Sequence, residues 1–403
     1  MEVARRNRNR RPGLIATTAA VVAAAAFATP ARSAPAEGTI LSAPDGKAVA
    51  GSYIVVLRDS AVSARAVPTT AEDLAARYGG TTGHVYTAAL RGFQAHLSEQ
   101  AARRLAAHPD VEYVQEDQKV SLAGTQSPVP SWGLDRIDQR ELPLDDAYTH
   151  PTGASGVKAY ILDTGILTTH QDFGGRAVHG RDVIGNDDDA TDCHGHGTHV
   201  AGTVGGTAHG VAKDVTLVAV RVATCAGGGS IAQLVAGIDW VTGDHTTGPA
   251  VANVSIMASP NKALDSAVTN SIADGVTYAV AAGNLYGSDA CGYSPGRTPD
   301  AITVGATTDT DARSGSSNVG RCLDLFAPGS GITSAWIGSD TAVRTASGTS
   351  MATPHVAGAA ALVKARDPAF TPQQVRDRLV ADATRDAVTN PGDGSPNSLL
   401  FVG

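Results

Sequence analysis

Five short, almost entirely apolar runs recur in the second part of this 403-residue chain, and helical stretches separate them. The runs lie at residues 157–162, 216–220, 250–256, 277–282 and 301–304. Short β-branched runs that alternate with helices are typical of a parallel sheet buried on both faces. The sequence therefore predicts an α/β fold with a doubly wound, mostly parallel sheet and helices on both of its faces. In such sheets, functional residues collect at the carboxyl ends of the strands.

A smaller unit is predicted ahead of this sheet, at about residues 52–121. Its pattern predicts strands at 53–57, 84–87, 92–97 and 111–116, a helix at 70–78, and a second helix that Ser98 caps and that ends at residue 107. The order β-α-β-β-α-β is that of the ferredoxin-like α+β unit. Residues 37–51 are rich in Gly, Ala, Pro and Ser, which predicts a flexible lead, and a loop at 123–130 is predicted to separate the two domains.

The N-terminus has the charge pattern of an export signal. Arginines at positions 5 to 11 precede an apolar, Ala-rich segment at 14–28, and Ala34-Pro35-Ala36 offers a cleavage site between small residues. A membrane anchor is the alternative, but a membrane span requires about 20 apolar residues. We therefore expect residues 1–36 to be a signal peptide, and the mature protein to be secreted and free of the membrane.

Export affects the interpretation of the four cysteines, at positions 193, 225, 291 and 322. In an oxidising compartment an even number of cysteines favours two disulfides, and spacing alone leaves all three connectivities open. Zinc binding is the alternative, but the chain has no C-x-x-C pair. The net charge of −8 and the absence of a dominant basic block argue against nucleic acid as a partner.

Three polar residues lie where the fold would place chemistry. Asp163 directly follows the run at 157–162, His196 precedes a helix of small residues, and Ser350 opens a helix that continues to residue 364. Singly they have ordinary interpretations: a turn carboxylate, a member of a histidine cluster that lacks the Glu of H-E-x-x-H, and a helix N-cap. Together they supply a nucleophile, a base that takes its proton, and a group that orients the base. A helix N-terminus would also favour negative charge that develops beside Ser350.

These motifs carry a resemblance to a known family. The segments 159–165, 194–202 and 348–358 resemble the three signature segments of the subtilases, in the chain order Asp, His, Ser of subtilisin. The similarity is greatest to the proteinase K and aqualysin branch, and the small domain resembles the inhibitor-type propeptide of these enzymes. The resemblance implies a subtilisin-like fold and a secreted serine endopeptidase that is made as a self-processing zymogen.

The resemblance also implies the domain roles and the partners. Residues 37–122 would be a propeptide that acts as an intramolecular inhibitor, residues 123–403 the peptidase domain, and cleavage would occur near 121–126. Polypeptides would be the substrates of a monomeric enzyme. Calcium would be the structural ion, and no organic cofactor is expected.

Further site residues are implied by the resemblance alone. Asn284 matches the oxyanion-binding asparagine of the family. Two segments match the edges that pair with the substrate backbone, namely Gly227, Gly228 and Gly229 on one side and Ser255, Ile256 and Met257 on the other. The cysteines would pair as Cys193–Cys225 and Cys291–Cys322. Calcium would be held by the carboxylate of Asp324 and the carbonyls of Pro299 and Ala301, whereas the acidic run at 187–189 is interpreted as a solvated loop.

The chain departs from the family pattern at three positions. Met257 stands where glycine is usual, which predicts a reshaped pocket and reduced acceptance of large aromatic residues at P1, the substrate residue before the scissile bond. His194 replaces a common asparagine, and Ser316 replaces a common aromatic residue.

Two other functions fit the sequence less well. An exported inhibitor with the first domain as its working part conflicts with the complete set of catalytic residue types. A lipase or esterase would need G-x-S-x-G, and the segment 348–352 lacks the second glycine.

Overall fold

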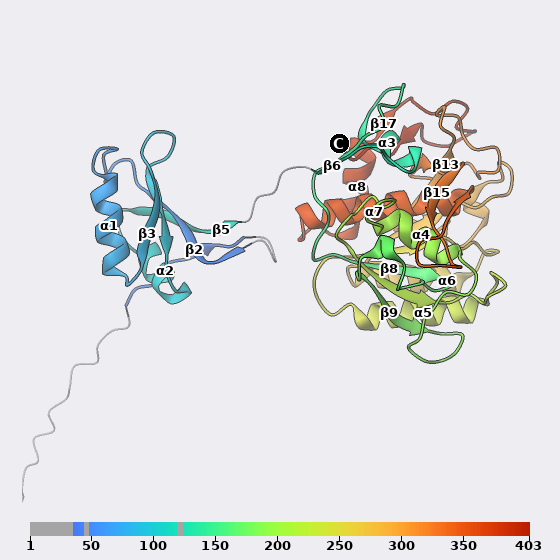
Figure 1. The fold of residues 1–403 in the computed structure, drawn as a ribbon, viewed down its shortest axis with the longest axis horizontal. Coiled ribbons are helices and arrows are strands. Elements are labelled where there is room, and N and C mark those ends of the chain that lie inside the picture. The colour runs from blue at the N-terminus through green and yellow to red at the C-terminus, as the bar shows by residue number, and fades with distance from the viewer. Residues whose placement is uncertain (1–34, 44–47, 119–123) are drawn as a thin grey trace, which may run out of the picture.

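The computed structural model describes residues 35–43, 48–118 and 124–403, which form two domains with separate hydrophobic cores. The first domain carries a five-stranded sheet and the second a nine-stranded sheet (Figure 1). Of the predicted signal peptide, only Pro35 and Ala36 fall within the described residues, so this prediction lies outside the structure. Within the described ranges, we find no helix that combines the length and the apolar character needed to cross a membrane.

The first domain has the predicted ferredoxin-like arrangement, with strand order β1-β5-β2-β4-β3. Its two helices pack on one face of the sheet, around alternate strand residues such as Val55 and Phe93. The side chain of Ser98 accepts a hydrogen bond from Ala101 N–H, so the predicted cap of the second helix is confirmed. The elements are β1 (Ile40–Leu41), β2 (Ala48–Leu57), α1 (Val67–Arg77), β3 (Thr81–Tyr86), β4 (Gly92–His96), α2 (Glu99–Ala106) and β5 (Val111–Gln118).

The prediction of a flexible lead at 37–51 is wrong in the described part of that segment. Strand β1 pairs in parallel with β5, with Ile40 opposite Val114, and β2 already begins at Ala48. The carboxylate of Glu116 also accepts a hydrogen bond from Ala43 N–H. Edge pairing of this kind is made by main-chain groups, so a composition rich in Gly, Ala and Pro does not reveal it.

The second domain contains the predicted doubly wound sheet, in the order β17-β18-β14-β13-β12-β11-β8-β10-β9. Every neighbouring pair from β18 to β9 is parallel, and only β17 and β18 run antiparallel. The sheet strands are β8 (Lys158–Asp163), β9 (Ala177–Asp182), β10 (Thr216–Arg221), β11 (Ala250–Val254), β12 (Thr277–Ala281), β13 (Ile302–Thr307), β14 (Leu325–Pro328), β17 (Thr384–Arg385) and β18 (Ser398–Leu399).

Helices cover both faces of this sheet. On β8, Ala159 and Ile161 face a core that includes α4 and α7, whereas Tyr160 and Leu162 face a second core that includes α5 and α6. Burial on both faces explains why the five predicted strands are almost entirely apolar, with Asn253 on β11 as a buried polar exception. The helices are α3 (Trp132–Asp138), α4 (His196–Gly205), α5 (Ile231–Asp244), α6 (Lys262–Ala273), α7 (Thr349–Arg366) and α8 (Pro372–Asp382), with short 3-10 turns η1 (Gln171–Phe173) and η2 (Ala290–Gly292).

Two small antiparallel pairs complete the domain. Strand β15 (Ile332–Ala335) pairs with β16 (Val343–Ala346), and β6 (Gly124–Gln126) pairs with β7 (Tyr148–His150). The loop predicted at 123–130 is therefore wrong for residues 124–126. Their main-chain bonds to β7 fasten the start of the second domain, and residue 123 lies outside the described part of the chain.

Candidate active site

The three predicted catalytic residues line one cleft. Asp163 is the last residue of strand β8, His196 the first residue of α4, and Ser350 the second residue of α7. The cleft has a volume of about 430 Å³ and brings together residues from four elements and the loops between them. Its lining also includes Thr164, His194, Ala223, Ala226, Gly227, Ser255, Ile256, Met257, Ala281, Gly283, Asn284 and Thr349.

Asp163 and His196 form a direct pair. His196 Nδ1 lies 2.7 Å from Oδ1 of Asp163, which is 1% exposed and also accepts a hydrogen bond from Thr164 N–H. Burial of the ring opposes its cationic form, but the Asp163 carboxylate outweighs this and raises the pKa of His196, with a smaller contribution from Asp192. The pair therefore fixes the ring with Nδ1 toward Asp163 and leaves Nε2 as the proton-accepting atom.

The loop that leads into α4 is held by Asp192, a residue that the sequence analysis did not select. Its Oδ1 accepts hydrogen bonds from the N–H groups of His194 and Gly195, and its Oδ2 accepts from Thr198. Asp192 is 5% exposed, so these bonds compensate for the burial of its charge. The sequence offered little signal for it, because Asp192 lies three residues before the N-cap Gly195 and not at the N-cap position itself.

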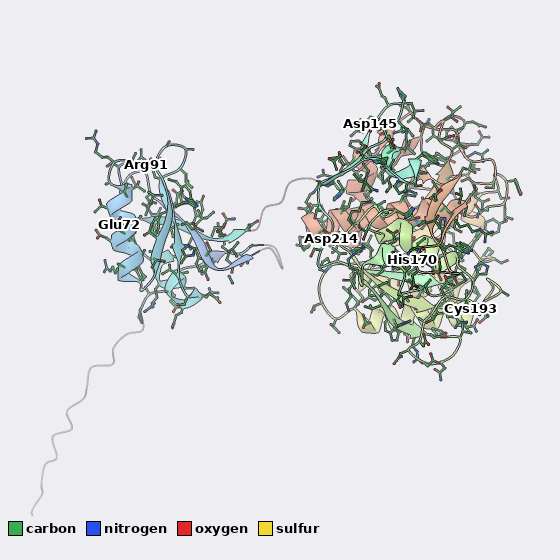
Figure 2. All side chains as sticks on the ribbon, viewed as in Figure 1. Glu72, Arg91, Asp145, His170, Cys193 and Asp214 are labelled. Atoms are coloured by element: carbon green, nitrogen blue, oxygen red, sulfur yellow. A yellow bond between two sulfur atoms is a disulfide. The ribbon has the colours of Figure 1, made fainter. Side chains whose placement is uncertain are left out.

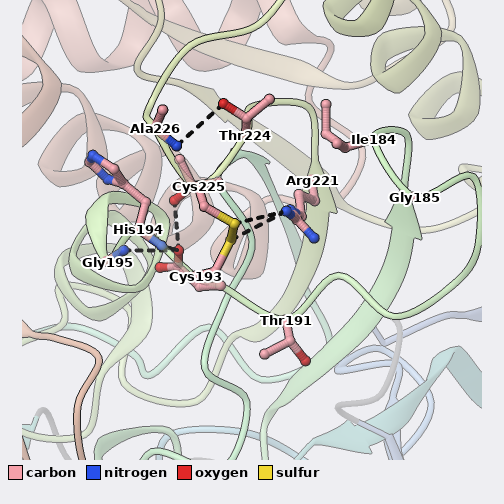
Figure 3. The surroundings of a disulfide bond; sticks show 12 residues. Ile184, Gly185, Thr191, Cys193, His194, Gly195, Arg221, Thr224, Cys225 and Ala226 are labelled. Carbon is pink, nitrogen blue, oxygen red and sulfur yellow. Dashed lines mark hydrogen bonds between the residues drawn. A yellow bond between two sulfur atoms is a disulfide. The ribbon is translucent and has the colours of Figure 1, made fainter.

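The predicted disulfide Cys193–Cys225 is confirmed, and so is Cys291–Cys322. Cys193 lies at the surface of the second domain (Figure 2) and is only three residues before His196 in the chain. Arg221 lies against this bridge, with Nη2 at 3.2 Å and 3.4 Å from the two sulfurs (Figure 3). The bridge joins the histidine loop to the segment that precedes Gly227.

The Ser350 hydroxyl donates a hydrogen bond to the carbonyl of Ser255 at 3.2 Å. Across the described part of the chain, no hydrogen bond joins this hydroxyl to His196. Catalytic hydrogen bonds are often long or misaligned in free enzymes and tighten when substrate binds. Rotation about the Cα–Cβ bond of Ser350 is enough to redirect its hydroxyl within the cleft.

The orientation of Asn284 follows from its hydrogen bonds. Its side-chain oxygen accepts from Thr349 N–H at 2.8 Å and from the Thr349 hydroxyl at 3.1 Å. Because an N–H donor fixes the oxygen on that side, the amide nitrogen must point the other way. It lies beside Gly348, whose φ of +146° favours glycine and where an added Cβ would be 3.2 Å from Asn284 Nδ2.

The two predicted substrate edges face each other across the cleft and a second hollow of about 330 Å³. Gly227, Gly228 and Gly229 line this hollow on one side, and Ile256 and Met257 on the other.

Met257 reaches the wall opposite its own segment. A Cβ added at Gly283 would overlap the Met257 sulfur, so the methionine side chain spans the space between the ends of β11 and β12. It therefore occupies part of the pocket beside Ser350.

The predicted calcium ligands differ from expectation. Arg376, on α8, donates from Nε to Oδ1 of Asp324 at 2.7 Å and from Nη1 to the carbonyl of Pro299 at 2.6 Å. Asp324 Oδ2 accepts a hydrogen bond from Thr303 N–H. Burial raises the pKa of Asp324, although Arg376 and the Thr303 N–H oppose this.

As arranged, these residues do not fit a calcium ion, because the guanidinium already occupies two of the three predicted ligands. The third, Ala301, lies one residue before β13. Among the residues that the structure describes, no group of three or more His, Cys, Asp or Glu side chains is arranged around a shared metal position.

Comparison with known proteins identifies both domains. Residues 154–399 match the Subtilase family, and residues 52–123 match Peptidase inhibitor I9. The chain belongs to the subtilase family. It is a serine endopeptidase with an inhibitor-type domain ahead of it, as the three motifs predicted.

Individual relatives agree with this assignment. An extracellular serine proteinase of Thermus sp. is 49% identical over 98% of this chain and 99% of the relative, and alkaline serine exoprotease A of Vibrio alginolyticus is 45% identical over 90% and 69%. The crystal structure of a cold adapted subtilisin-like serine proteinase superposes with a TM-score of 0.66 at 50% identity, and the match covers 69% of this chain and 99% of that protein. The predicted similarity to aqualysin-like extracellular proteinases is confirmed.

Proposed function

We propose that this subtilase hydrolyses peptide bonds through an acyl-enzyme on Ser350. As Ser350 Oγ attacks the substrate carbonyl carbon, His196 Nε2 takes its proton, and the carbonyl π electrons move to the oxygen. His196 then returns the proton to the leaving amine as the C–N bond breaks, and water repeats the sequence to release the acid. The 2.7 Å contact between Asp163 and His196, in the same cleft as Ser350, carries this proposal.

Asn284 is assigned to the oxyanion. Its amide nitrogen is directed away from Thr349, at the N-terminus of the helix that carries Ser350. Together with the Ser350 N–H it would donate to the oxygen as negative charge develops there. The helix dipole of α7 acts in the same direction.

An extended substrate would lie as a strand between Gly227–Gly229 and Ser255–Met257. Main-chain hydrogen bonds to these edges would provide affinity that depends little on sequence, whereas the hollows between them accept side chains. In the free protein the Ser255 carbonyl accepts a hydrogen bond from the Ser350 hydroxyl. A substrate N–H that donates to this carbonyl would replace the hydroxyl and release it.

Met257 is proposed to favour small P1 residues. Its thioether lies against Gly283 and fills space that a large aromatic side chain would need. Matched peptides with Ala, Leu or Phe at P1 test this: we expect Ala to be cleaved best, and Met257→Gly to raise kcat/KM for Phe. Met257→Leu is the control, because it keeps the volume and should keep the preference. An undiminished preference of the native enzyme for Phe would refute the assignment.

The first domain is proposed to act as propeptide, from residue 37 to 122, after removal of a signal peptide at 1–36 and secretion. The match to an inhibitor family supports the propeptide role, and the name of the Thermus relative, an extracellular serine proteinase, supports secretion. We expect cleavage ahead of β6, because the pairing of β6 with β7 belongs to the peptidase domain. Ser350→Ala precursor produced alone should remain uncut, and processing of that purified variant at the same point would contradict self-cleavage.

The decisive test of the nucleophile is labelling with a serine-reactive phosphonate. The adduct should map to Ser350, and one equivalent should abolish peptide cleavage. Asp163→Asn and His196→Ala should slow labelling. Labelling elsewhere with full loss of activity would overturn the proposed function.

Arg376 is proposed to take the place of the cation that the family resemblance implies. Its guanidinium neutralises Asp324 and satisfies the Pro299 carbonyl, two tasks that calcium would perform with the same oxygens. Calcium as a structural ion is implied by the family resemblance alone. At this position, however, the positive charge is part of the polypeptide.

A further inference from the structure

Helix α7 contains a proline, Pro354, as its sixth residue. In an α-helix the carbonyl of residue i accepts a hydrogen bond from the N–H of residue i+4. Proline has no N–H, so Pro354 cannot donate to the carbonyl of Ser350. The nucleophile therefore sits on a peptide group that has lost its helical partner.

Ser255 supplies the missing donor. Its hydroxyl donates to the Ser350 carbonyl at 3.0 Å, and its side chain lies just beyond the end of β11, which packs against α7. Ser255 is 6% exposed, so the bond is shielded from water. A buried carbonyl left without a donor would be costly, and this contact removes that cost.

Asn253 fixes the direction of that hydroxyl. It lies two residues earlier on β11, is 1% exposed, and donates from Nδ2 to Ser255 Oγ at 2.9 Å. A hydroxyl carries one hydrogen. Since Asn253 donates to the oxygen, that single hydrogen is available for the Ser350 carbonyl.

Ser255 and Ser350 are joined by two hydrogen bonds. The Ser255 hydroxyl donates to the Ser350 carbonyl, and the Ser350 hydroxyl donates to the Ser255 carbonyl. One end of the central sheet thus holds both the backbone and the side chain of the nucleophile. Small shifts of a nucleophile change rates strongly, since reacting atoms must approach to about 3–3.5 Å in the right direction.

We propose that Asn253 and the Ser255 side chain are positioning residues, which hold the Ser350 peptide in register through the carbonyl that Pro354 leaves free. This proposal rests on the proposed role of Ser350 as nucleophile. It concerns the hydroxyl of Ser255, and not its carbonyl, which substrate would use.

A double-mutant cycle tests it, with Ser255→Ala and Pro354→Ala made singly and together in the full-length precursor. In the native background Ser255→Ala should lower kcat about tenfold and change KM less than about twofold, because only an internal bond is lost. Pro354→Ala restores a backbone N–H that can donate to the Ser350 carbonyl. In that background Ser255→Ala should therefore cost less than about twofold. Equal losses in the two backgrounds would overturn the proposal, whatever Pro354→Ala does by itself.

Three further variants distinguish the hydrogen bond from a simple packing effect. Ser255→Thr keeps a hydroxyl and should recover most of the kcat lost in Ser255→Ala. Asn253→Ala should lower kcat about threefold when Ser255 is present and add nothing when it is absent. Recovery with Ser255→Val instead of Ser255→Thr would contradict the hydrogen-bond role.

Failure of this inference can be distinguished from failure of the proposed function. If the phosphonate labels Ser350 in every variant but the cycle shows no coupling, the positioning role of Asn253 and Ser255 is wrong, whereas the assignment of Ser350 as nucleophile is supported. If the phosphonate labels another residue, both assignments are wrong.

Discussion

The peptidase domain holds two polar sites that differ in how completely their groups are paired. In the cleft, the described residues provide no hydrogen-bond partner for the buried Oδ2 of Asp163. The Asn284 amide nitrogen likewise has no acceptor among them, because the two hydrogen bonds of this side chain are made by its oxygen. At the second site, which Asp324 and Arg376 form, both carboxylate oxygens accept hydrogen bonds and the guanidinium also binds the Pro299 carbonyl.

The difference in pairing indicates whether the polar groups of a site serve the reaction or the stability of the fold. Groups held in place without partners are ready to bind charge that develops in a reaction. Groups that already bind each other contribute to the folded state, and removing one leaves the other buried and unpaired. Substitutions in the cleft should therefore change rates more than stability, and substitutions at the ion pair should do the reverse.

The largest expected effect is that of Asp163→Asn. Loss of the charge that orients His196 should lower kcat by about 10⁴-fold. The pH profile should change as well. Because Asp163 raises the pKa of His196, native kcat/KM should fall with acid through a pKa above the ordinary histidine value, and this limb should move to lower pH in the variant.

The control for this experiment is Asp239→Asn, on the exposed surface of α5. It should leave both the rate and the pH profile unchanged. An acid limb that stays in place in Asp163→Asn would show that another group controls it.

Asn284→Leu should have the next largest effect. Removal of one oxyanion donor lowers kcat by about 10²–10³-fold, with little change in KM, because the bond strengthens only in the transition state. The unfolding temperature should also fall, but modestly, because leucine cannot accept the hydrogen bonds that the Thr349 N–H and hydroxyl donate to Asn284. Asn270→Ala, on the exposed side of α6, is the matched control. If Asn284→Leu raised KM and left kcat unchanged, the role of Asn284 in binding the oxyanion would be contradicted.

Arg376→Ala should reverse the pattern, with stability lost and kcat/KM retained within about twofold. Breaking a buried ion pair costs roughly 3–5 kcal/mol. We expect about 2–3 kcal/mol here, because the Arg376 side chain is 26% exposed. Asp324 would then be free to bind a cation, so calcium should raise the unfolding temperature of Arg376→Ala more than that of the native enzyme.

Arg378→Ala is the control for the helix, because its pair with Asp382 is exposed on the same element. It should cost less than about 0.5 kcal/mol. An equal response of native enzyme and Arg376→Ala to calcium would refute the replacement of the ion by arginine.

The smallest effect concerns Asp138, which has a buried unpartnered oxygen among the described residues but lies outside the cleft lining. Burial raises its pKa to about 6. The folded state therefore binds more protons than the unfolded state between about pH 4 and 6, and this group makes stability fall as pH rises through that window.

Asp138→Asn should remove that dependence and stabilise the enzyme by on the order of 1 kcal/mol above pH 6, with no change in kcat/KM. Urea unfolding at pH 4 and pH 7 measures it, with the exposed Asp377→Asn as control. A lower kcat/KM would mean that unpaired groups outside the cleft also serve the reaction.

Much of the sheet could be predicted from the sequence, because strands buried on both faces are almost entirely apolar. Strand β9 was missed for the opposite reason: it lies at the sheet edge and includes the polar residues His179 and Arg181. Strand β1 was missed because it is two residues long and paired by main-chain groups.

The site was predictable where a motif is local. Asp163, His196 and Ser350 each stand in a distinctive run, whereas Asn253 resembles any residue of a buried strand until its contact with Ser255 is seen. Arg376 gave no signal either, since a charged residue on a helix is usually solvated. Pro354 was a missed clue, because a proline within a helix always frees the carbonyl four residues earlier.

The bridge between Cys193 and Cys225 has a consequence for a protease that other molecules of the same enzyme can cleave. It encloses the 32-residue interval from the histidine loop to the substrate edge. A neighbouring molecule that nicks the chain once within this interval would produce two fragments that remain covalently joined beside the cleft. The cut ends then stay at high local concentration, so the damaged molecule can keep its shape and resist a second cut.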